Sequence, residues 1–361
     1  MIGVNKARIY YGGFAFRGGG AYMHAKLMRA ELQRSGWHVD LITLESLPLV
    51  LRFLPHCVGW LINFFSPPMG YYYKGRLTRL FYRLLFNRDA NIRIFEDIYL
   101  AWDSRIPSVT LLHAVWSDNL QSIDISNDRV NLLIKAEEKL IDFITHPIIT
   151  VSDSYKDFLE KSHVGSSRIP RISVIPLGLD IAEFEKGDEL LKPAKSLVFC
   201  GSLEARKNLS FLLTVFKTLH DSDGRYSLTI IGDGPDRPDL ERYAVQHDLP
   251  VSFCGRLGRR DVIRELRRHT LYVHPSVKES FSFALLEAKL TGLKTVAYSG
   301  LEVPVEFIDV PVASFDEAEW FRAISCAEVT ATQEVDFHAY SSRMMVQKTL
   351  RLAFGATEVT L

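Results

Sequence analysis

The feature that most constrains the fold is an alternation of short strand-like runs with longer helical runs, which occurs twice along the chain. The first series of β-branched and aromatic runs reads "ARIYYG", "HVDLITL", "NIRIFE", "SVTLLHA", "PIITVS" and "ISVIPLG". The second series reads "KSLVFCG", "YSLTIIG", "VSFCG", "TLYVHPS" and "LKTVAYS". Helical spacing separates these runs, which indicates parallel sheets with helices on both faces. We therefore predict an α/β chain with two doubly wound domains.

The domain boundary is predicted between the two series, in the charged segment of residues 176–196, which glycine and proline interrupt. We expect an N-terminal domain over residues 1–178, a hinge over 179–189 and a C-terminal domain over 190–337. The last amphipathic stretch, about residues 338–361, follows the completed second series. We expect it to form a helix that completes the N-terminal domain.

The overall composition excludes some partners and sites. The 361 residues include 43 Lys and Arg and 43 Asp and Glu, so no global charge attracts nucleic acid. Four widely spaced cysteines form no CxxC or CxxH pair, so neither a zinc site nor a disulfide framework is indicated. They are Cys57, Cys200, Cys254 and Cys326. A reducing cytosol fits this cysteine usage best.

Neither the first residues of the chain nor its most apolar segment fits a targeting signal or a membrane span. The first residues, "MIGVNKARIYYGG", lack the apolar core and cleavage site of a signal peptide. The most apolar segment, residues 47–65, is interrupted by Arg52, Pro55, His56 and Asn63, whereas a membrane span needs about 20 apolar residues with few charges. We therefore expect a cytoplasmic protein without a transmembrane helix.

Three predicted strand-to-helix turns contain glycine, at residues 12–21, 200–208 and 231–238. Glycine lets backbone N–H groups approach a phosphate, and a helix N-terminus adds partial positive charge. Each turn alone is explained equally well by the steric need for glycine in a tight turn. Three such turns in two halves, one beside Arg206 and Lys207, favour a phosphate-bearing ligand at the carboxyl ends of the strands.

Two common nucleotide-binding motifs are absent. The turn "GGFAFRGGG" does not fit G-x-G-x-x-G, although Glu45 stands roughly where a ribose-binding acid would lie. No G-x-x-x-x-G-K-[ST] loop occurs. A D-x-D sequence at residues 221–223 lies in a predicted helix-to-strand loop, at the wrong end of the sheet for a site, and is interpreted as a solvated turn.

The segment "KESFSFALLEA", residues 278–288, places Glu279 and Glu287 at the edges of an apolar run. A helix is predicted to begin between them, so the N–H groups of about residues 281–284 are free to meet a phosphate. Ionised carboxylates accept hydrogen bonds from hydroxyl groups. A ligand with a central phosphate and polyols on both sides, a nucleoside diphosphate sugar, fits this pattern. The alternative is that both acids are surface charges of a helix.

These segments together resemble the retaining family 4 glycosyltransferases of the GT-B fold (glycosyl transferases group 1). The resemblance covers nearly the whole chain and is strongest in the E-x₇-E pattern after "HPS". Other matching segments, in the order of the family, are "RGGGAYMHAKLMRAELQRSGWHVDLITLE", "HPIITVSDSYKDFLEK", "ISVIPLGLDIAEF", "LVFCGSLEARKNLSFLL", "LTIIGDGPDRPDLERYA" and "VSFCGRLGRRDVIREL". The resemblance implies two Rossmann-like domains that face each other across a cleft. The first would bind the acceptor and the second the nucleotide sugar.

The resemblance also implies roles for individual residues. Gly18, Gly19 and Gly20 would approach the donor phosphates. His113, in "LLHAVW", would lie near the donor sugar because it ends a strand at the cleft, and the alternative is a structural histidine below the strand end. Arg206 and Lys207 would neutralise the diphosphate, beside the turn residues Gly201 and Ser202. The family often has arginine where Ser202 stands.

The remaining implied positions lie in the second series. Phe253, Arg256 and Leu257, in "FCGRL", would meet the base. Glu279 would hold the sugar and Glu287 the ribose. The helix start, Phe281, Ser282 and Phe283, would meet the phosphate, although the family usually has glycine in place of Ser282. Glu306, in "GLEVPVEF", only loosely matches a further motif.

The function implied is transfer of a hexose-type sugar from a UDP-, GDP- or other nucleotide sugar to an acceptor hydroxyl. Anomeric configuration would be retained, and the reaction would need neither a metal ion nor another cofactor. A phosphate oxygen of the donor would take the acceptor proton. The setting we expect is assembly of a bacterial surface polysaccharide or lipopolysaccharide. Two alternatives are a glycoside hydrolase, with the two glutamates as acid and nucleophile, and a catalytically silent nucleotide-sugar binding protein.

The acceptor is expected to be a glycan or a lipid-linked molecule. Residues 66–89 combine aromatic and basic side chains after an apolar segment, a pattern typical of a peripheral contact with an anionic membrane, here the inner face. The aromatic and basic residues are Tyr71, Tyr72, Tyr73, Lys74, Arg76, Arg79, Arg83 and Arg88. Equally, the leucines between them could form a core face, with the arginines on the solvated side. The sequence does not indicate the oligomeric state.

Overall fold

The computed structural model describes residues 5–15, 19–66, 68–115, 117, 127–185 and 193–355. The chain divides into two compact units. Unit 1 comprises Met1–Asp180 and His338–Leu361, and unit 2 comprises Ile181–Phe337. Each unit is built around one parallel sheet of six strands, so the predicted α/β fold with two doubly wound domains is confirmed.

The sheet of unit 1 has the strand order β2-β1-β3-β4-β5-β6. Its strands are β1 (Lys6–Tyr10), β2 (His38–Ile42), β3 (Ile92–Phe95), β4 (Ser108–Leu112), β5 (Ile148–Thr150) and β6 (Ser173–Val174). Tyr10 of β1 pairs with Ile42 on one side and with Phe95 on the other. The winding of the chain therefore reverses between β1 and β3, and the carboxyl ends of these strands form a topological switch point, where α/β sheets bind ligands.

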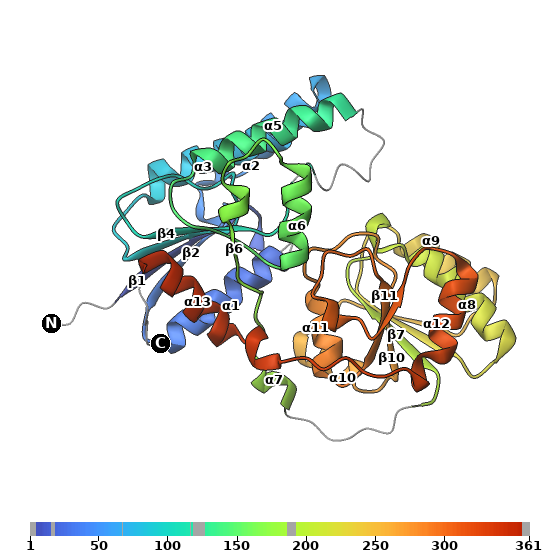
Figure 1. Cartoon of the computed structure of the whole chain (residues 1–361). Coiled ribbons are helices and arrows are strands. Elements are labelled where there is room, and N and C mark those ends of the chain that lie inside the picture. The colour runs from blue at the N-terminus through green and yellow to red at the C-terminus, as the bar shows by residue number, and fades with distance from the viewer. Residues whose placement is uncertain are drawn as a thin grey trace. The chain divides into compact units, whose positions relative to one another are not determined.

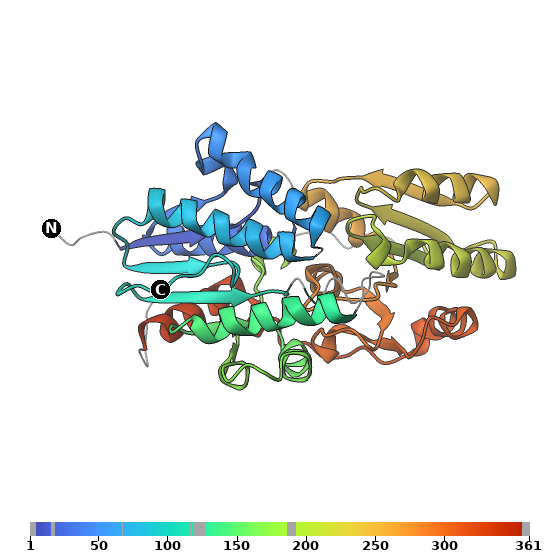
Figure 2. The same cartoon turned by 90° about the horizontal axis from the view of Figure 1, so that it is seen from above.

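Helices cover both faces of the sheet of unit 1 (Figure 1). On one face lie α1 (Gly20–Arg34) and α13 (Ser342–Phe354), which share an apolar core with the strands. On the other face lie α2 (Leu49–Phe65), α3 (Met69–Phe86) and α5 (Asn127–Phe143). Figure 2 looks down on this second face and shows α2 and α3 next to each other. A shorter helix, α6 (Asp153–Ser162), follows β5.

The sheet of unit 2 has the order β12-β11-β10-β7-β8-β9, so its switch point lies between β7 and β10. Its strands are β7 (Ser196–Cys200), β8 (Ser227–Ile231), β9 (Val251–Gly255), β10 (Leu271–His274), β11 (Lys294–Tyr298) and β12 (Val310–Val312). The helices α8 (Leu209–Ser222), α9 (Arg237–Gln246) and α12 (Glu317–Cys326) lie on one face, and α10 (Arg259–Leu266) and α11 (Phe283–Leu290) on the other (Figure 1).

Burial on both faces explains why the strands appear in the sequence as continuous apolar runs. All residues of β3, β4 and β10 are buried. In unit 1 the core extends from Ile9 and Ile94 in the strands to Met28 of α1 and Leu350 of α13. The short strand β12 and the helix α12 that follows it were not predicted from the sequence. Among the helices of the described residues, none combines the length and the apolarity that a membrane crossing requires.

Candidate functional site

A cluster of charged side chains lies at the switch point of unit 2, where the segments after β7 and β10 meet. Lys207 ends the 3₁₀ turn η4 (Ala205–Lys207), is buried, and donates a hydrogen bond from Nζ to Oε1 of Glu279. The same carboxylate oxygen lies 3.4 Å from Nε2 of His274 and 3.5 Å from Nη1 of Arg206. Three residues predicted from the sequence, Glu279, Lys207 and Arg206, are thus brought together.

The electrostatics of this cluster keep Glu279 ionised. Burial alone would raise the pKa of Glu279, but the positive charge of Lys207 and the hydrogen bond with His274 outweigh burial and hold it far below its usual value. Burial lowers the pKa of His274, and the neighbouring Glu279 opposes this shift. The cluster therefore offers a carboxylate that can accept from hydroxyl groups, next to two cations that can neutralise a phosphate.

Helix α11 begins beside this cluster, with Ser282 as its N-cap. The backbone of Ser282 has φ 64° and ψ 89°, a left-handed conformation that ordinarily favours glycine. Its Oγ accepts a hydrogen bond from the backbone N–H of Leu285 and so caps the helix. At the position where the resembling family has glycine, this chain therefore keeps a glycine-like backbone and uses serine as the N-cap.

Glu287, the second predicted carboxylate, is held by an arginine. Nη1 of Arg259, in α10, lies 2.7 Å from Oε1 of Glu287, and Arg259 also donates to Glu183. Burial raises the pKa of Glu287, and the charge of Arg259 opposes this shift. That Glu287 binds a ribose stays a prediction. A bound ribose would share the carboxylate of Glu287 with Arg259.

The aromatic residues predicted around the helix start are mainly structural. The side chain of Phe281 is 2% exposed and packs against Phe283 and Phe307. A ligand can therefore contact Phe281 only through its backbone. Glu306 lies half-buried in the 3₁₀ turn η5 (Val305–Phe307) of the same unit.

The other predicted residues of unit 2 lie at strand ends. Ser202, just after β7, donates from Oγ to Oε1 of Glu204 at 2.8 Å. Phe253 lies on β9, half-buried against the core. Arg256 and Leu257 follow β9, the first exposed and the second half-buried. Among the described residues, no hydrogen bond or ion pair joins Phe253, Arg256 or Leu257 to the Glu279 cluster.

The glycine after β8, in one of the three predicted turns, is explained by packing. Gly232 has φ 133°, and a Cβ atom there would overlap the carbonyl oxygen of Gly201. The turns after β7 and β8 thus touch backbone to backbone, which requires glycine whether or not a ligand binds. The steric interpretation of the turn at residues 231–238 is therefore sufficient.

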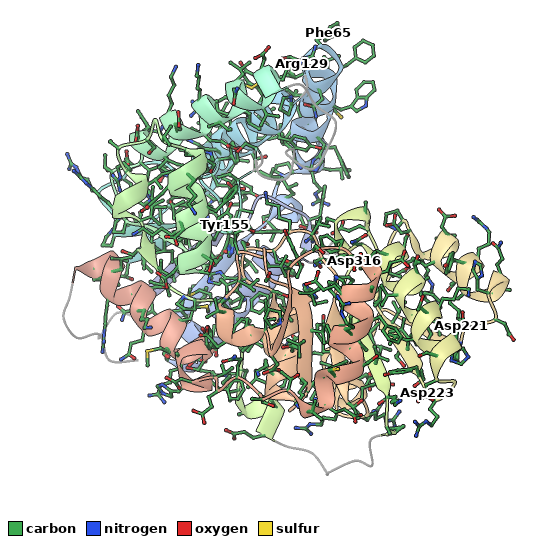
Figure 3. All side chains as sticks on the ribbon, turned by 45° about the vertical axis from the view of Figure 1, so that its right-hand side comes forward. Phe65, Arg129, Tyr155, Asp221, Asp223 and Asp316 are labelled. Atoms are coloured by element: carbon green, nitrogen blue, oxygen red, sulfur yellow. The ribbon has the colours of Figure 1, made fainter. Side chains whose placement is uncertain are left out.

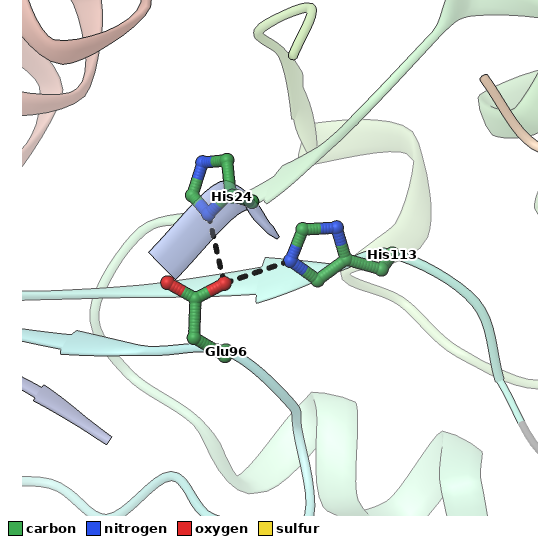
Figure 4. Close-up of side chains that lie close together, drawn as sticks. All are labelled: His24, Glu96 and His113. Carbon is green, nitrogen blue, oxygen red and sulfur yellow. Dashed lines mark hydrogen bonds and ion pairs between the residues drawn. The ribbon is translucent and has the colours of Figure 1, made fainter. Parts of the chain in front are cut away.

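A second cluster lies in unit 1, at the carboxyl ends of β3 and β4 (Figure 4). Glu96, directly after β3, accepts hydrogen bonds at Oε2 from Nδ1 of His24 and from Nε2 of His113, both at 2.8 Å. His24 and Glu96 are buried, and His113 is half-buried directly after β4. The predicted residue His113 is thus fixed by two partners that the sequence analysis did not single out.

The charge of this second cluster resides on Glu96. Burial would raise the pKa of Glu96, but His24 and His113 lower it to about 2. Burial lowers the pKa of His113, against the opposing effect of Glu96. An ionised carboxylate only accepts hydrogen bonds, so both ring nitrogens that face Glu96 carry protons. The three ligand atoms lie within 4.8 Å of one another and could hold a metal ion, but these hydrogen bonds explain their positions without one.

The first glycine loop is described only in part. Gly18 lies outside the described residues. Gly19, with φ 102°, is the residue before α1, and Gly20 is the first residue of that helix. Glu45, which stands in the sequence roughly where a ribose-binding acid would lie, accepts hydrogen bonds from the backbone N–H of Ala15 and the hydroxyl of Thr43, both at 2.7 Å. It therefore fastens the loop after β1.

The D-x-D sequence behaves as a turn. Asp221 pairs with Lys217 at 2.5 Å, and Asp223 pairs with Arg225 at 2.7 Å and also with Lys195. Figure 3 shows both aspartates at the periphery of unit 2. Each carboxylate already has a cationic partner, in agreement with the interpretation as a solvated turn.

Comparison with known families decides what kind of chain this is. Residues 18–183 match the family described as Glycosyltransferase Family 4, and residues 194–326 match the one described as Glycosyl transferases group 1. The chain belongs to the family 4 glycosyltransferases of the GT-B fold. The resemblance inferred from the sequence motifs is thereby confirmed.

The relatives of this glycosyltransferase are distant. It is 22% identical over 220 residues to alpha-monoglucosyldiacylglycerol synthase of Streptococcus pneumoniae. The matched region covers 56% of this chain and 48% of that protein. The chain thus spans about half the length of this curated relative. Among solved structures, sucrose-phosphate synthase from Thermosynechococcus elongatus has a TM-score of 0.68 at 14% identity, over 97% of both chains. HepE of Anabaena, in complex with UDP and glucose, has a TM-score of 0.61 at 14% identity, over 98% of both chains. These two likenesses show the shared fold.

Proposed function

We propose that this glycosyltransferase moves a sugar from a nucleotide diphosphate sugar to an acceptor hydroxyl, with retention of anomeric configuration. The observation that carries the proposal is the cluster at the switch point of unit 2, where Glu279 lies beside Lys207 and Arg206. Membership of the family supports sugar transfer, and the binding of UDP and glucose by HepE supports a nucleotide-sugar donor.

The proposed chemistry needs groups that stabilise a leaving diphosphate. The bond between the anomeric carbon and the diphosphate oxygen breaks, and a bond from the acceptor oxygen forms on the same face of the sugar. The acceptor proton passes to a phosphate oxygen of the leaving group. Lys207, Arg206 and the first N–H groups of α11 would stabilise the negative charge that develops, without a metal ion. Glu279 would accept hydrogen bonds from the donor sugar.

The test is the substitution Glu279→Ala. We expect transfer to fall by about 10²–10³-fold or more, because a group that acts in the transition state is lost, while UDP or GDP still binds. Glu241→Ala, which removes a half-buried carboxylate from α9 of the same unit, is the matched control. Wild-type transfer by the Glu279 variant would contradict the assignment. Transfer that stops when EDTA is added would contradict the metal-independent mechanism.

The same assay separates the two alternatives. A nucleotide-sugar binding protein without activity would bind UDP or GDP but would neither transfer sugar nor slowly hydrolyse the donor. A glycoside hydrolase would cleave a nitrophenyl glycoside and would not require a nucleotide. A glycoside hydrolase does not explain why Lys207 and Arg206 flank Glu279.

The proposal extends to a lipid-linked acceptor at the inner face of a bacterial membrane, in surface polysaccharide or lipopolysaccharide assembly. It is supported by α2, which turns one apolar stripe outward. Eight large side chains of the stripe, each 40–85% exposed, are Leu49, Val50, Phe53, Leu54, Trp60, Leu61, Phe64 and Phe65. Their spacing follows the helical repeat, and Figure 3 shows Phe65 at the outer limit of unit 1.

The charge around this stripe favours an anionic bilayer surface. Residues 49–88 contain six Lys and Arg and no Asp or Glu. Arg76, Arg79 and Arg83 follow one another along α3, and their mutual repulsion adds to burial in lowering the pKa of Arg79. Each basic residue near an anionic leaflet adds about 1 kcal/mol, and an apolar stripe lying in the interface adds buried area.

Vesicle binding tests this part of the proposal. We expect the protein to sediment with vesicles of phosphatidylglycerol and phosphatidylcholine, less at high salt, and not with phosphatidylcholine alone. The double substitution Trp60→Ser and Phe64→Ser should abolish binding, whereas Val245→Ser, an equally exposed position in unit 2, should not. If vesicle binding changed neither with lipid charge nor with the double substitution, the proposed membrane-binding surface on α2 and α3 would be ruled out.

A further inference from the structure

A cavity of about 290 Å³ lies in unit 1, at the switch point between β1 and β3. Its walls come from the loop after β1, from α3 and from the segment after β3. The chemically informative residues of the wall are Tyr11, Tyr71, Lys74, Glu96, Asp97 and Tyr99. Ligands of doubly wound sheets bind at the carboxyl ends of strands at such switch points, so the cavity occupies the expected place for a ligand.

One buried atom in the wall lacks a partner. Glu96 is 3% exposed, and its Oε2 accepts from both His24 and His113, but its Oε1 has no hydrogen-bond partner among the described residues. A buried carboxylate oxygen without a donor is costly, because desolvation is not compensated. An ionised carboxylate cannot donate, so Oε1 needs an O–H or N–H group, which water or a hydroxyl-bearing ligand in the cavity can supply.

The rest of the wall suits a ring with several hydroxyl groups. The tyrosines offer aromatic faces together with hydroxyl groups. Three glycines, at residues 12, 13 and 75, also line the cavity and add no side chain to it. Asp97 adds a second carboxyl group. Burial raises its pKa to about 7, so near neutral pH it exists both as a hydrogen-bond donor and as an acceptor.

The cavity is joined to the candidate site through Glu96 itself. The carboxylate that lines the cavity also fixes His113, the residue proposed to lie near the donor sugar. The cavity also contacts α2 through His56 and α3 through Tyr71 and Lys74, the two helices of the proposed membrane surface. A molecule in the cavity therefore lies between the helices of the proposed membrane surface and the pair of Glu96 and His113.

We propose that this cavity binds the hydroxyl-bearing ring of the acceptor, a sugar or cyclic polyol, and that Oε1 of Glu96 accepts a hydrogen bond from a ring hydroxyl. The inference rests on the proposed function, since it names the acceptor class of the same transfer. It adds Glu96 as an acceptor-binding residue.

The cavity can be filled without touching its polar wall. Ala21, in the first turn of α1, contributes to the lining, and its replacement by valine or leucine places extra methyl groups inside. Ala30, half-buried in the same helix and outside the cavity, gives Ala30→Leu as the matched control. The valine variant serves if the leucine variant does not fold.

The probes are n-octyl glycosides of glucose, galactose and mannose, which carry a sugar ring and an apolar tail. We expect the best of them to bind wild type, measured by calorimetry without donor, and Ala21→Leu to weaken binding by about ten-fold or more. Ala21→Val should lie between the two, and Ala30→Leu should bind as wild type. In transfer assays, the KM for the octyl glycoside should rise and the KM for the nucleotide sugar should not.

The outcomes separate this inference from the proposed function. Equal binding of the probes by wild type and Ala21→Leu overturns the acceptor cavity, even if transfer is active. A rise in the KM for the nucleotide sugar alone overturns it too, because the cavity then holds the donor. Specific binding in a wild type that transfers nothing supports the cavity and contradicts the proposed function.

Discussion

At the scale of single residues, neighbouring carboxyl groups are tuned in opposite directions by their surroundings. The histidines around Glu96 lower its pKa to about 2 in spite of burial. For Asp97, the next residue, burial outweighs the opposing charges of His113 and Lys74 and raises its pKa to about 7. One segment after β3 thus carries a permanent negative charge and a titrating group side by side, the pattern by which enzymes assign different roles to adjacent acids.

Asp97→Asn should remove a pH-dependent loss of stability. The folded pKa of Asp97 lies above its ordinary value of 3.8, so the folded state keeps a proton that the unfolded state releases between about pH 4 and pH 7. Stability from this group is complete below pH 4 and is lost as the pH rises towards 7. The neutral amide avoids the loss. Between pH 5 and pH 8 the free energy of unfolding of the variant should therefore rise by roughly 2–3 kcal/mol relative to wild type.

Urea unfolding at both pH values measures this difference. Asp157→Asn, which removes an exposed carboxylate from α6 of the same unit, controls for the loss of a surface charge. A difference between Asp97→Asn and wild type that does not change with pH would show that Asp97 is ionised throughout.

At the scale of elements, α2 and α3 form a helix pair that crosses at two glycines. A Cβ atom on Gly70 would overlap the carbonyl oxygen of Gly59 and the side chain of Asn63. The amide oxygen of Asn63 accepts a hydrogen bond from the backbone N–H of Gly70 at 2.8 Å. This close contact fixes the rotation of α2, so that its apolar stripe faces away from α3.

Gly70→Ala should therefore destabilise the helix pair. The added methyl group has no space, and overpacking of this kind costs about 1–3 kcal/mol. Urea unfolding measures the loss, with Gly224→Ala as control, because a Cβ at Gly224 meets no atom within 4 Å. If the two variants were equally stable, the helices would not be in contact at Gly59 and Gly70.

The sequence predicted the elements whose signal is local. The buried parallel strands are visible in the sequence as apolar runs. Glu279 and Glu287 were predicted to flank the start of a helix, and α11 does begin between them, at Phe283. Residues 47–89 were seen as apolar and basic, but not as two helices, because an apolar stripe that faces outward does not follow the core pattern. Glu96, like the predicted His113, directly follows a strand, so the strand-end rule could have found it as well. His24 gave no such signal, since its partner Glu96 is 72 residues away in the chain.

At the scale of the whole molecule, unit 1 is discontinuous and unit 2 is one segment of chain. The last helix, α13, returns to unit 1 and buries Met345, Val346 and Leu350 in the core that α1 and the strands share. Its start is fixed by backbone hydrogen bonds between Leu179 and the residues Tyr340 and Ser342, all at 2.8 Å. Unit 1 is therefore complete only when the end of the chain is present, whereas unit 2 is enclosed between residues 181 and 337.

Leu350→Ala should consequently affect the two units differently. Leu350 is fully buried, and the loss of its side chain costs about 2–5 kcal/mol through lost burial and the cavity left behind. Urea unfolding should show a less stable unit 1, while UDP or GDP should bind with unchanged affinity under native conditions, since the proposed nucleotide site lies in unit 2. Arg343→Ala, an exposed position on the same helix, controls for a change in α13 itself. A parallel loss of nucleotide affinity would mean that the nucleotide site depends on unit 1, and wild-type stability would mean that α13 contributes little to the core.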